Sequence, residues 1–477
     1  MVVDFLVLTA GNGISEYRNS LGLRTLGAHK VAWIAREHGY STMVVGKLQL
    51  LSEEEIVEMC SKFVGPGTVI GVSTTMIAIP GMGARQTSAG NKITTNIFNA
   101  IHRLKAEHNN KVIAGGPLAS LFQNSLKQDY TIDGQAENKV VELLDKIKRF
   151  GIQKKPYDWN IKTCGFRWAD HDFLQPDEVV PLETGRGCIF SCNFCAWEEI
   201  GKKKGTYETS LDSIQEQLVE NYEKFGVTHY MLMTDTFNDN DERMNEWCDM
   251  LESLPFKIKY SGFMRLDLMH RYQNTTRRMY ETGLRGCHFG IESFHPEASR
   301  AIGKAFNGKK GKEFLDKLHN EIFERNVFIT TTNIIGLPGE DEKSVEETFE
   351  WYKNRNYIQA VFSSLFLSTK KEYYVKNSEF SANPEKNGYR FPDPNDTEYW
   401  VNDNFDFYHA SELAKKYNED LIKPTNIDSW TGLNLLAALN EEPRTYFSQT
   451  NSELRIRAKH GVFEQNKKYF ESIRNMS

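Results

Sequence analysis

Three cysteines in one short stretch give the chain its most specific chemical signal. Cys188, Cys192 and Cys195 lie within "RGCIFSCNFCAW", directly after an apolar run of strand length. A structural zinc site uses four nitrogen or sulfur ligands, and no second pair of ligands follows nearby. Three thiolates suit a [4Fe-4S] cluster whose fourth iron stays open for another molecule. We therefore predict such a cluster here, in preference to zinc or free thiols.

The spacing Cys-x3-Cys-x2-Cys, with Phe194 just before the last cysteine, resembles that of the radical SAM enzymes. "PLETGRGCIFSCNFC" is similar to the first barrel strand and cluster loop of a branch of this family that carries an N-terminal cobalamin-binding domain. The resemblance extends over roughly Pro181–Phe366. It implies that S-adenosylmethionine supplies the missing ligands through its amino and carboxylate groups, and that one-electron reduction cleaves it to a 5′-deoxyadenosyl radical.

Polar side chains at later strand ends could hold this cofactor. A sulfonium compound with an amino-acid tail needs acceptors for its ammonium and ribose hydroxyls and a cation for its carboxylate. Glu292 could accept from the ammonium or the ribose, and Arg265 could hold the carboxylate. Asp235 could bind a polar group or shape the substrate side, and Phe194 would pack beside the cluster. Taken singly, each acid could equally be a solvated loop residue.

The stretch "GLPGE" at Gly336–Glu340 is expected to form a tight turn that lets the backbone approach the adenine. For Glu340 itself, capping of the following helix is favoured over a role as a ligand.

Strands and helices alternate over residues 1–150. The strands are apolar along their whole length and the helices are amphipathic, which predicts a doubly wound, Rossmann-like parallel sheet. Ligands of such sheets bind at the carboxyl ends of the strands. The small or hydrogen-bonding residues predicted there are Ser73, Thr74, Gly115, Gly116 and Gly134.

These strand ends resemble a cobalamin-binding domain, which implies cobalamin as a second organic cofactor. The motif D-x-H-x-x-G, whose histidine binds cobalt in many cobalamin proteins, is absent, and His29 and His38 do not match it. Cobalamin would therefore bind without a histidine ligand. The alternative is a domain of this fold that binds nothing.

Residues 151–180 lack a regular period and are expected to form a linker. Residues 181–367 contain six predicted strands with intervening helices, which suggests a partial (β/α)6 barrel with its chemistry at the carboxyl ends of the strands. Residues 368–477 are polar and aromatic, then helical, and are expected to cap the barrel and shape the substrate site. The fold class is therefore α/β with a mostly helical C-terminal region.

Composition narrows the possible partners and location. The net charge of −6 argues against a broadly basic nucleic-acid-binding surface. No apolar run approaches about 18 residues, so no membrane span is predicted. The N-terminus lacks the features of a signal peptide. An odd number of mostly scattered cysteines, seven in all, fits a reducing compartment, so a cytoplasmic location is expected.

The predicted function is a cobalamin-dependent radical SAM enzyme that methylates an unactivated carbon of a small-molecule or peptide substrate. A flavodoxin- or ferredoxin-like protein would donate the electron. One alternative is a cyclase or rearrangement enzyme without methyl transfer, and another is a non-catalytic iron–sulfur sensor or electron-transfer protein. A methylthiotransferase is disfavoured because Cys60 is the one cysteine of residues 1–150, too few for a second cluster.

Overall fold

The structure of the chain is a computed structural model. It describes residues 1–11, 23–77, 88–117, 119–148, 160–162, 165–196, 203, 205, 208–304, 306, 308–368, 378–393, 395–421, 432–434, 437–448 and 452–476. Residues 151–159, 163 and 164 of the expected linker, and several loops, lie outside these ranges.

The N-terminal part contains a five-stranded parallel sheet in the order β2-β1-β3-β4-β5. In an open sheet of this order the direction of winding reverses between β1 and β3, and ligands bind at the carboxyl ends of the strands near that point. The Rossmann-like prediction is confirmed. The strands are β1 (Phe5–Thr9), β2 (Thr42–Val45), β3 (Val69–Ser73), β4 (Lys111–Gly116) and β5 (Tyr130–Asp133).

Both faces of this sheet are covered because its strands are apolar on both sides. Along β1, Phe5 and Val7 join one hydrophobic core, and Leu6 and Leu8 join the other. The first core includes residues of α1 (Leu26–Glu37) and α5 (Val140–Lys148). The second includes residues of α2 (Glu53–Ser61), α3 (Ser88–His108) and α17 (Ser452–Arg474).

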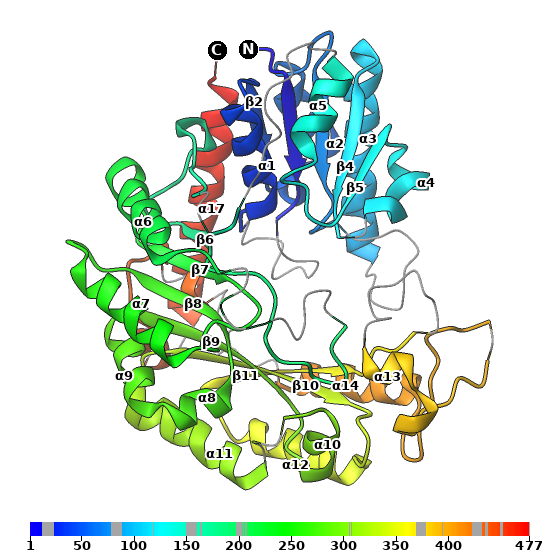
Figure 1. Cartoon of the computed structure of the whole chain (residues 1–477), viewed down its shortest axis with the longest axis vertical. Helices are drawn as coiled ribbons and strands as arrows, with labels where there is room; N and C mark the ends of the chain where they lie inside the picture. The colour runs from blue at the N-terminus through cyan, green and yellow to red at the C-terminus, as the bar shows by residue number, and fades with distance from the viewer. Residues whose placement is uncertain are drawn as a thin grey trace. The chain divides into compact units, whose positions relative to one another are not determined.

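A second sheet has six strands that are neighbours in strict chain order, β6 to β11. This order, with parallel pairing from β7 to β11, is that of an open (β/α)6 barrel and confirms the prediction (Figure 1). The strands are β6 (Val179–Glu183), β7 (His229–Met233), β8 (Lys259–Met264), β9 (Leu284–Glu292), β10 (Phe328–Ile335) and β11 (Ile358–Ser364).

Helices connect these strands and follow the last of them. The connecting helices are α6 (Leu211–Phe225), α7 (Asp241–Ser253), α8 (Leu266–Arg271), α9 (Gln273–Glu281), α10 (Pro296–Ala301), α11 (Gly308–Lys317) and α12 (Glu342–Lys353). The described C-terminal region is mostly helical, as expected, with α13 (Glu379–Ala382), α14 (Phe407–Leu421), α16 (Pro443–Ser448) and α17. No helix in the described part of the chain is long and apolar enough to cross a bilayer.

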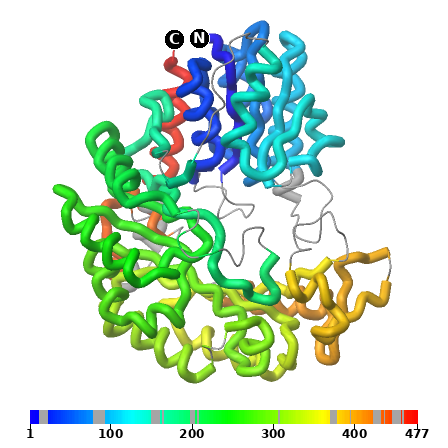
Figure 2. The backbone as a smooth tube through the Cα atoms, viewed as in Figure 1, coloured from blue at the N-terminus to red at the C-terminus, as the bar shows by residue number. Residues whose placement is uncertain are grey.

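The chain divides into two compact units. Unit 1 comprises Met1–Pro181, Asp212–Thr228 and Ala458–Ser477, and unit 2 comprises Leu182–Leu211 and His229–Arg457. Unit 1 thus gathers parts from three regions of the sequence, as the colours of Figure 2 show. The sequential boundaries at 150, 180 and 367 stay a prediction, since this division groups residues by spatial contact.

Buried ion pairs explain why the second half of the linker belongs to unit 1. Glu178 accepts from Arg24 Nε at 2.8 Å and from Lys47 Nζ at 3.1 Å, and all three side chains are buried. Lys47 also donates to Asn466 of α17 at 3.0 Å. Charges removed from water are stable only when they are paired in this way. The linker and α17 are therefore fixed to the N-terminal sheet.

Candidate functional site

The cysteine loop follows β6 and lies in unit 2. The Cys188 thiol lies 3.2 Å from the hydroxyl of Thr236, which follows β7. The amide of Cys195 donates to the carbonyl of Cys192 at 3.0 Å, so the second and third cysteines share one turn. All three thiols are partly exposed. The three thiols are therefore accessible on the surface of the loop, where an inorganic ligand can bind.

The three cysteines fit a cluster better than a single metal ion. Within the described ranges, no three His, Cys, Asp or Glu side chains are arranged around one metal-ion position. In a [4Fe-4S] cluster with one open iron, each of the other three irons binds one thiolate. Three thiols on one loop are the donor set that such a cluster requires.

Asn193 fixes the cysteine loop to two other segments of unit 2. Its side-chain Nδ2 donates to the carbonyl of Ala301 at 2.7 Å, and its backbone amide donates to the carbonyl of Ile302 at 3.3 Å. Its own carbonyl accepts from the hydroxyl of Ser378 at 3.0 Å and from the amide of Phe380 at 3.1 Å. The end of α10 and the start of α13 therefore both position the loop.

Glu292, the last residue of β9, lies where the strand pairing becomes irregular. The register with β10 slips between Thr332 and Asn333, and Glu292 has a φ of 64°. This left-handed conformation is uncommon outside glycine. The buried carboxylate accepts from Lys304 Nζ at 2.8 Å. The same ammonium lies 5.5 Å from the centre of the Phe194 ring, so an acid and a base meet beside the cysteine loop.

Arg265 contacts the cysteine loop from the end of β8. Its guanidinium lies 3.9 Å from the centre of the Phe190 ring and donates to both carboxylate oxygens of Asp267 at 2.9 Å. Its amide donates to Asn238 Oδ1 at 2.8 Å. Two donors of Arg265 are thus engaged by Asp267. Its predicted role toward the cofactor carboxylate stays a prediction.

Electrostatics connect these residues to the cysteines. Burial raises the pKa of the Cys192 thiol, and the positive charges of Lys304 and Arg265 oppose that rise. Two cations near a thiol favour its thiolate form, which is the form that binds iron. The negative charge of Glu292 acts in the opposite direction on Cys192. The four residues are close enough to influence one another.

A small polar pocket lies at the carboxyl ends of β6 and β7. Thr236, which contacts Cys188, forms part of its wall. The buried hydroxyl of Thr184 in the same wall has no hydrogen-bond partner among the described residues. Asp235 is partly exposed at the end of β7, next to this wall. The lining residues are Thr184, Gly185, Arg186, Gly187, Ile189, Glu208, Thr234, Thr236, Phe237, Asp239 and Arg243.

The turn after β10 confirms one expectation and corrects another. Gly336 and Gly339 have φ angles of 99° and 83°, so Gly336–Glu340 forms the tight turn predicted. The capping role expected for Glu340 is wrong. Asp341 caps α12 and forms a capping box with Ser344, and Glu340 is buried. The aspartate one position later has the shorter side chain that an N-cap prefers.

The residues predicted for cobalamin lie together in unit 1, at the carboxyl ends of β3, β4 and β5. The Thr74 amide donates to the Gly115 carbonyl at 2.8 Å, and the Gly134 amide donates to the Gly116 carbonyl at 2.9 Å. Ser73 ends β3 beside them. A Cβ atom added to Gly115 or Gly134 would meet no atom of the described residues within 4 Å. We call the surface formed by Ser73, Thr74, Gly115, Gly116 and Gly134 the ledge of unit 1.

Sequence reasoning missed Lys304, Thr236 and Asn193. Lys304 lies twelve residues after Glu292, beyond a short helix, so no local period connects the two. Asn193 and Thr236 could have been noticed, because a small polar residue inside a cysteine motif and one just after a strand often make local hydrogen bonds.

Comparison with known proteins gives one family and several relatives. The radical SAM superfamily matches residues 182–352. A probable threonylcarbamoyladenosine tRNA methylthiotransferase from Methanocaldococcus jannaschii is 22% identical over 249 residues, covering 50% of this chain and 56% of the relative. The ribosomal protein uS12 methylthiotransferase RimO from Thermoanaerobacter is 23% identical over 291 residues, covering 58% of this chain and 63% of the relative. The chain thus spans less than two thirds of the length of these relatives.

Two solved structures share the fold. The methyltransferase TsrM from Kitasatospora setae, with cobalamin and a [4Fe-4S] cluster bound, gives a TM-score of 0.60 at 14% identity, covering 97% of this chain and 99% of TsrM. The cobalamin-dependent enzyme OxsB, with aqua-cobalamin and S-adenosylmethionine bound, gives 0.52 at 13% identity, covering 80% of this chain and 55% of OxsB. At such low identity the likeness concerns the fold.

Proposed function

Residues 182–352 of this chain are a radical SAM domain, and from this premise we propose that the chain is an enzyme that binds a [4Fe-4S] cluster on Cys188, Cys192 and Cys195. S-adenosylmethionine binds beside the cluster, and cobalamin binds on the ledge of unit 1. The reaction is methyl transfer to an unactivated carbon of a small-molecule or peptide substrate. When bound, the cluster supplies the electron that cleaves S-adenosylmethionine, and cobalamin supplies the methyl group.

The observation that carries the proposal is the meeting of Lys304 and Glu292 beside the cysteine loop, 2.8 Å apart. The amino-acid tail of S-adenosylmethionine has one ammonium and one carboxylate. A carboxylate and an ammonium of the protein are therefore the matching pair, and charge-assisted hydrogen bonds of this kind are strong. When S-adenosylmethionine binds, the ion pair between Lys304 and Glu292 is replaced by two ion pairs, one between Glu292 and the ligand ammonium and one between Lys304 and the ligand carboxylate.

Aromatic rings shield this place from water. Phe194 lies against the Lys304 ammonium, and Phe190 lies against Arg265. Both rings belong to the cysteine loop, so the loop that holds the cluster also covers the charged groups. Where less water reaches the site, the effective dielectric constant is lower and the ion pairs with the ligand are stronger.

The choice of methyl transfer is supported by the fold shared with TsrM over nearly the whole of both chains. The curated relatives favour a second candidate, methylthio transfer. Cys60 argues against it, because it is the one cysteine of residues 1–150 and is fully buried. Burial raises the pKa of its thiol to about 12, which opposes metal binding.

The electron comes from an external flavodoxin- or ferredoxin-like protein, and the enzyme works in the reducing cytoplasm.

Anaerobic reconstitution with iron and sulfide tests the function. The wild-type protein should gain the cluster's absorbance and, with S-adenosylmethionine and dithionite, form 5′-deoxyadenosine. Replacing all three loop cysteines by alanine should abolish both, and Cys248→Ala, which removes a buried thiol of α7, should retain both. Absence of cluster and 5′-deoxyadenosine in the wild type would reject the proposal. Turnover of a substrate, with cobalamin bound, that yields 5′-deoxyadenosine but no S-adenosylhomocysteine would indicate a rearrangement in place of methyl transfer.

A further inference from the structure

Glu340 is a buried carboxyl group without a positive partner. Its exposed fraction is 4%. The hydroxyl of Ser293 donates to Oε1, and Oε2 accepts no hydrogen bond from any residue that the structure describes. Among the described residues no lysine or arginine forms an ion pair with it. A buried carboxylate with one oxygen unpaired is strongly disfavoured relative to the neutral acid.

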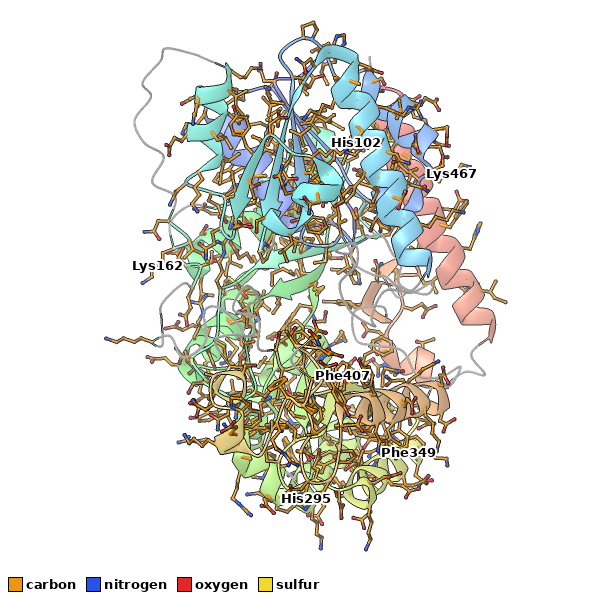
Figure 3. The ribbon with its side chains drawn as sticks, turned by 90° about the vertical axis from the view of Figure 1, so that its right-hand side faces the viewer. His102, Lys162, His295, Phe349, Phe407 and Lys467 are labelled. Carbon is orange, nitrogen blue, oxygen red and sulfur yellow. The ribbon has the colours of Figure 1, made fainter. Side chains whose placement is uncertain are left out.

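The other titratable groups around this turn do not supply a fixed positive charge. Asp341 follows Glu340 in the chain, and Tyr389 donates its hydroxyl to the turn at Gly336. Glu297 of α10 packs against the turn, and His295 precedes that helix (Figure 3). Burial raises the pKa of Glu340 to about 8, although hydrogen bonds from Ser293 and from the backbone at Leu337 and Gly336 oppose that rise. The negative charge of Asp341 adds to the rise.

Ser293 connects Glu340 to the predicted cofactor site. It follows Glu292 directly, and its amide donates to the Ile291 carbonyl at 2.8 Å across the left-handed residue. Its carbonyl accepts from the Ser299 hydroxyl at 3.1 Å. A left-handed glutamate persists only when its surroundings fix it. The Ser293 side chain is one of the groups that do so, and Glu340 accepts its hydrogen bond.

The turn that carries Glu340 is itself held from the C-terminal region. Asn404 donates to the Glu340 carbonyl at 2.7 Å. Asn402 donates to the Gly336 carbonyl at 3.0 Å, and the Trp400 ring packs so closely on Gly336 that a Cβ there would lie 2.3 Å from it. The turn has little freedom to move away from Ser293.

We propose that Glu340 is a positioning residue of the S-adenosylmethionine site: as a neutral acid it accepts the hydrogen bond of Ser293 and so holds Glu292 in its left-handed conformation, with its carboxylate toward Lys304. The inference rests on the proposed function and adds a residue to its site. Loss of the proton would strengthen the pull of Glu340 on the Ser293 hydroxyl and add a second buried negative charge behind Glu292, which opposes the Glu292 carboxylate. Binding of S-adenosylmethionine should therefore weaken as pH rises past the point at which Glu340 ionises.

Affinity for S-adenosylmethionine, measured by calorimetry on the reconstituted protein between pH 6.5 and 9, tests the proposal. Wild-type affinity should fall by about tenfold across pH 8, a change of about 1.4 kcal/mol. Glu340→Gln keeps an acceptor and cannot ionise, so it should bind like wild type at pH 7 and show a smaller fall, because only the amino group of the ligand, with a pKa of about 8, then titrates. Glu340→Ala and Ser293→Ala should bind about tenfold more weakly at every pH. Weak binding by Glu340→Gln at pH 7, or a fall with pH equal to that of wild type, would overturn the proposal.

The pH dependence of stability, measured without any ligand, tests independently whether Glu340 is protonated. Because the carboxyl binds its proton more tightly in the folded protein, wild-type stability should fall from about pH 4.5 to about pH 8 and then level off. Relative to wild type, the melting temperature of Glu340→Gln should be unchanged at pH 5 and several degrees higher at pH 8. Glu346→Gln, an exposed change on α12 with the same loss of charge, is the control. A difference that does not vary with pH would overturn the neutral-acid assignment.

The binding measurements and the melting measurements together distinguish failure of this proposal from failure of the proposed function. If the wild type binds no S-adenosylmethionine at any pH, the proposed function fails, and the melting curves still decide whether Glu340 holds a proton. If the wild type binds and the variants do not differ, the proposed function stands and the role of Glu340 fails.

Discussion

The Lys304 ammonium lies 2.8 Å from the buried carboxylate of Glu292, the last residue of β9. Lys304 follows α10, so the chain turns back after this helix to bring the two groups together. In the protein without ligand, the two groups neutralise each other's charge. The ammonium can pair with the carboxylate of an amino acid, and the carboxylate can pair with its ammonium. Removing one of them leaves the other charge buried and unpaired, which costs about 3–5 kcal/mol in proteins.

Lys304→Met should therefore lower the free energy of unfolding by about 3 kcal/mol and weaken binding of S-adenosylmethionine by tenfold or more. Chemical denaturation and calorimetry measure the two effects. Lys309→Met, at a neighbouring lysine whose side chain is 89% exposed, should change neither. The double variant Lys304→Met with Glu292→Gln should regain stability and still bind poorly, since no charge is left unpaired. Normal binding by Lys304→Met would exclude it from the site.

Asn193→Ala should make the cluster easier to lose. The change leaves the Ala301 carbonyl without the donor at 2.7 Å, a loss of about 1–3 kcal/mol. A loss of 1 kcal/mol increases the open population of the loop about fivefold. The decay of cluster absorbance in air should accelerate by about that factor. Asn354→Ala, an exposed residue at the end of α12, serves as the control. Equal decay rates would show that Asn193 does not hold the loop.

Gly115→Ala should reduce cobalamin retention by tenfold or more without loss of folding. The added methyl group meets no atom of the described residues within 4 Å, so loss of cobalamin without loss of folding would indicate a ligand lying over the ledge. The visible absorbance of purified protein measures cobalamin, and circular dichroism checks the fold. Gly27→Ala, an equally open position on α1, should retain cobalamin. Unchanged cobalamin in Gly115→Ala would place the cofactor elsewhere.

Glu178→Gln should destabilise unit 1 by about 3–5 kcal/mol at pH 7, because Arg24 and Lys47 then lose their shared partner. Burial alone would raise the pKa of Glu178, but these two charges outweigh it and hold the pKa at about 2. The folded-state pKa is lowered, so the stabilisation is present above about pH 4.5 and is lost as the pH falls toward 2.

Thermal melts between pH 7 and pH 3 measure this dependence. The difference between wild type and Glu178→Gln should shrink as the solution becomes acidic. Glu216→Gln, whose carboxyl is 67% exposed, should behave like wild type throughout. A difference that stays constant with pH would mean that Glu178 contributes through packing and not through charge.

The sequence predicted the features that repeat or lie close together in the chain. Apolar strands such as Phe5–Thr9 were identified because burial on both faces leaves an unbroken apolar run. The cysteine motif was identified because its three members are local. The position of Glu292 at a strand end also followed from the pattern, although its left-handed backbone did not.

Features that depend on distant contacts could not be predicted. The ion pair of Lys304 requires the return of the chain after α10, and the burial of Glu340 requires the packing of Trp400 and Asn404 on its turn. The linker was expected to separate two domains. Its acid at Glu178 became part of unit 1 because two cations from elsewhere in the chain are buried around it.

The three-part make-up of unit 1 has a consequence for synthesis on the ribosome. Tyr469, Phe470 and Ile473 of α17 complete the core that includes Met59 and Phe63, yet roughly 230 residues separate Thr228 from Ala458. At about 5–20 residues per second, translation leaves that core uncovered for roughly 10–50 s. Apolar surface exposed for so long favours aggregation, so the nascent chain should depend on chaperones until its last helix emerges.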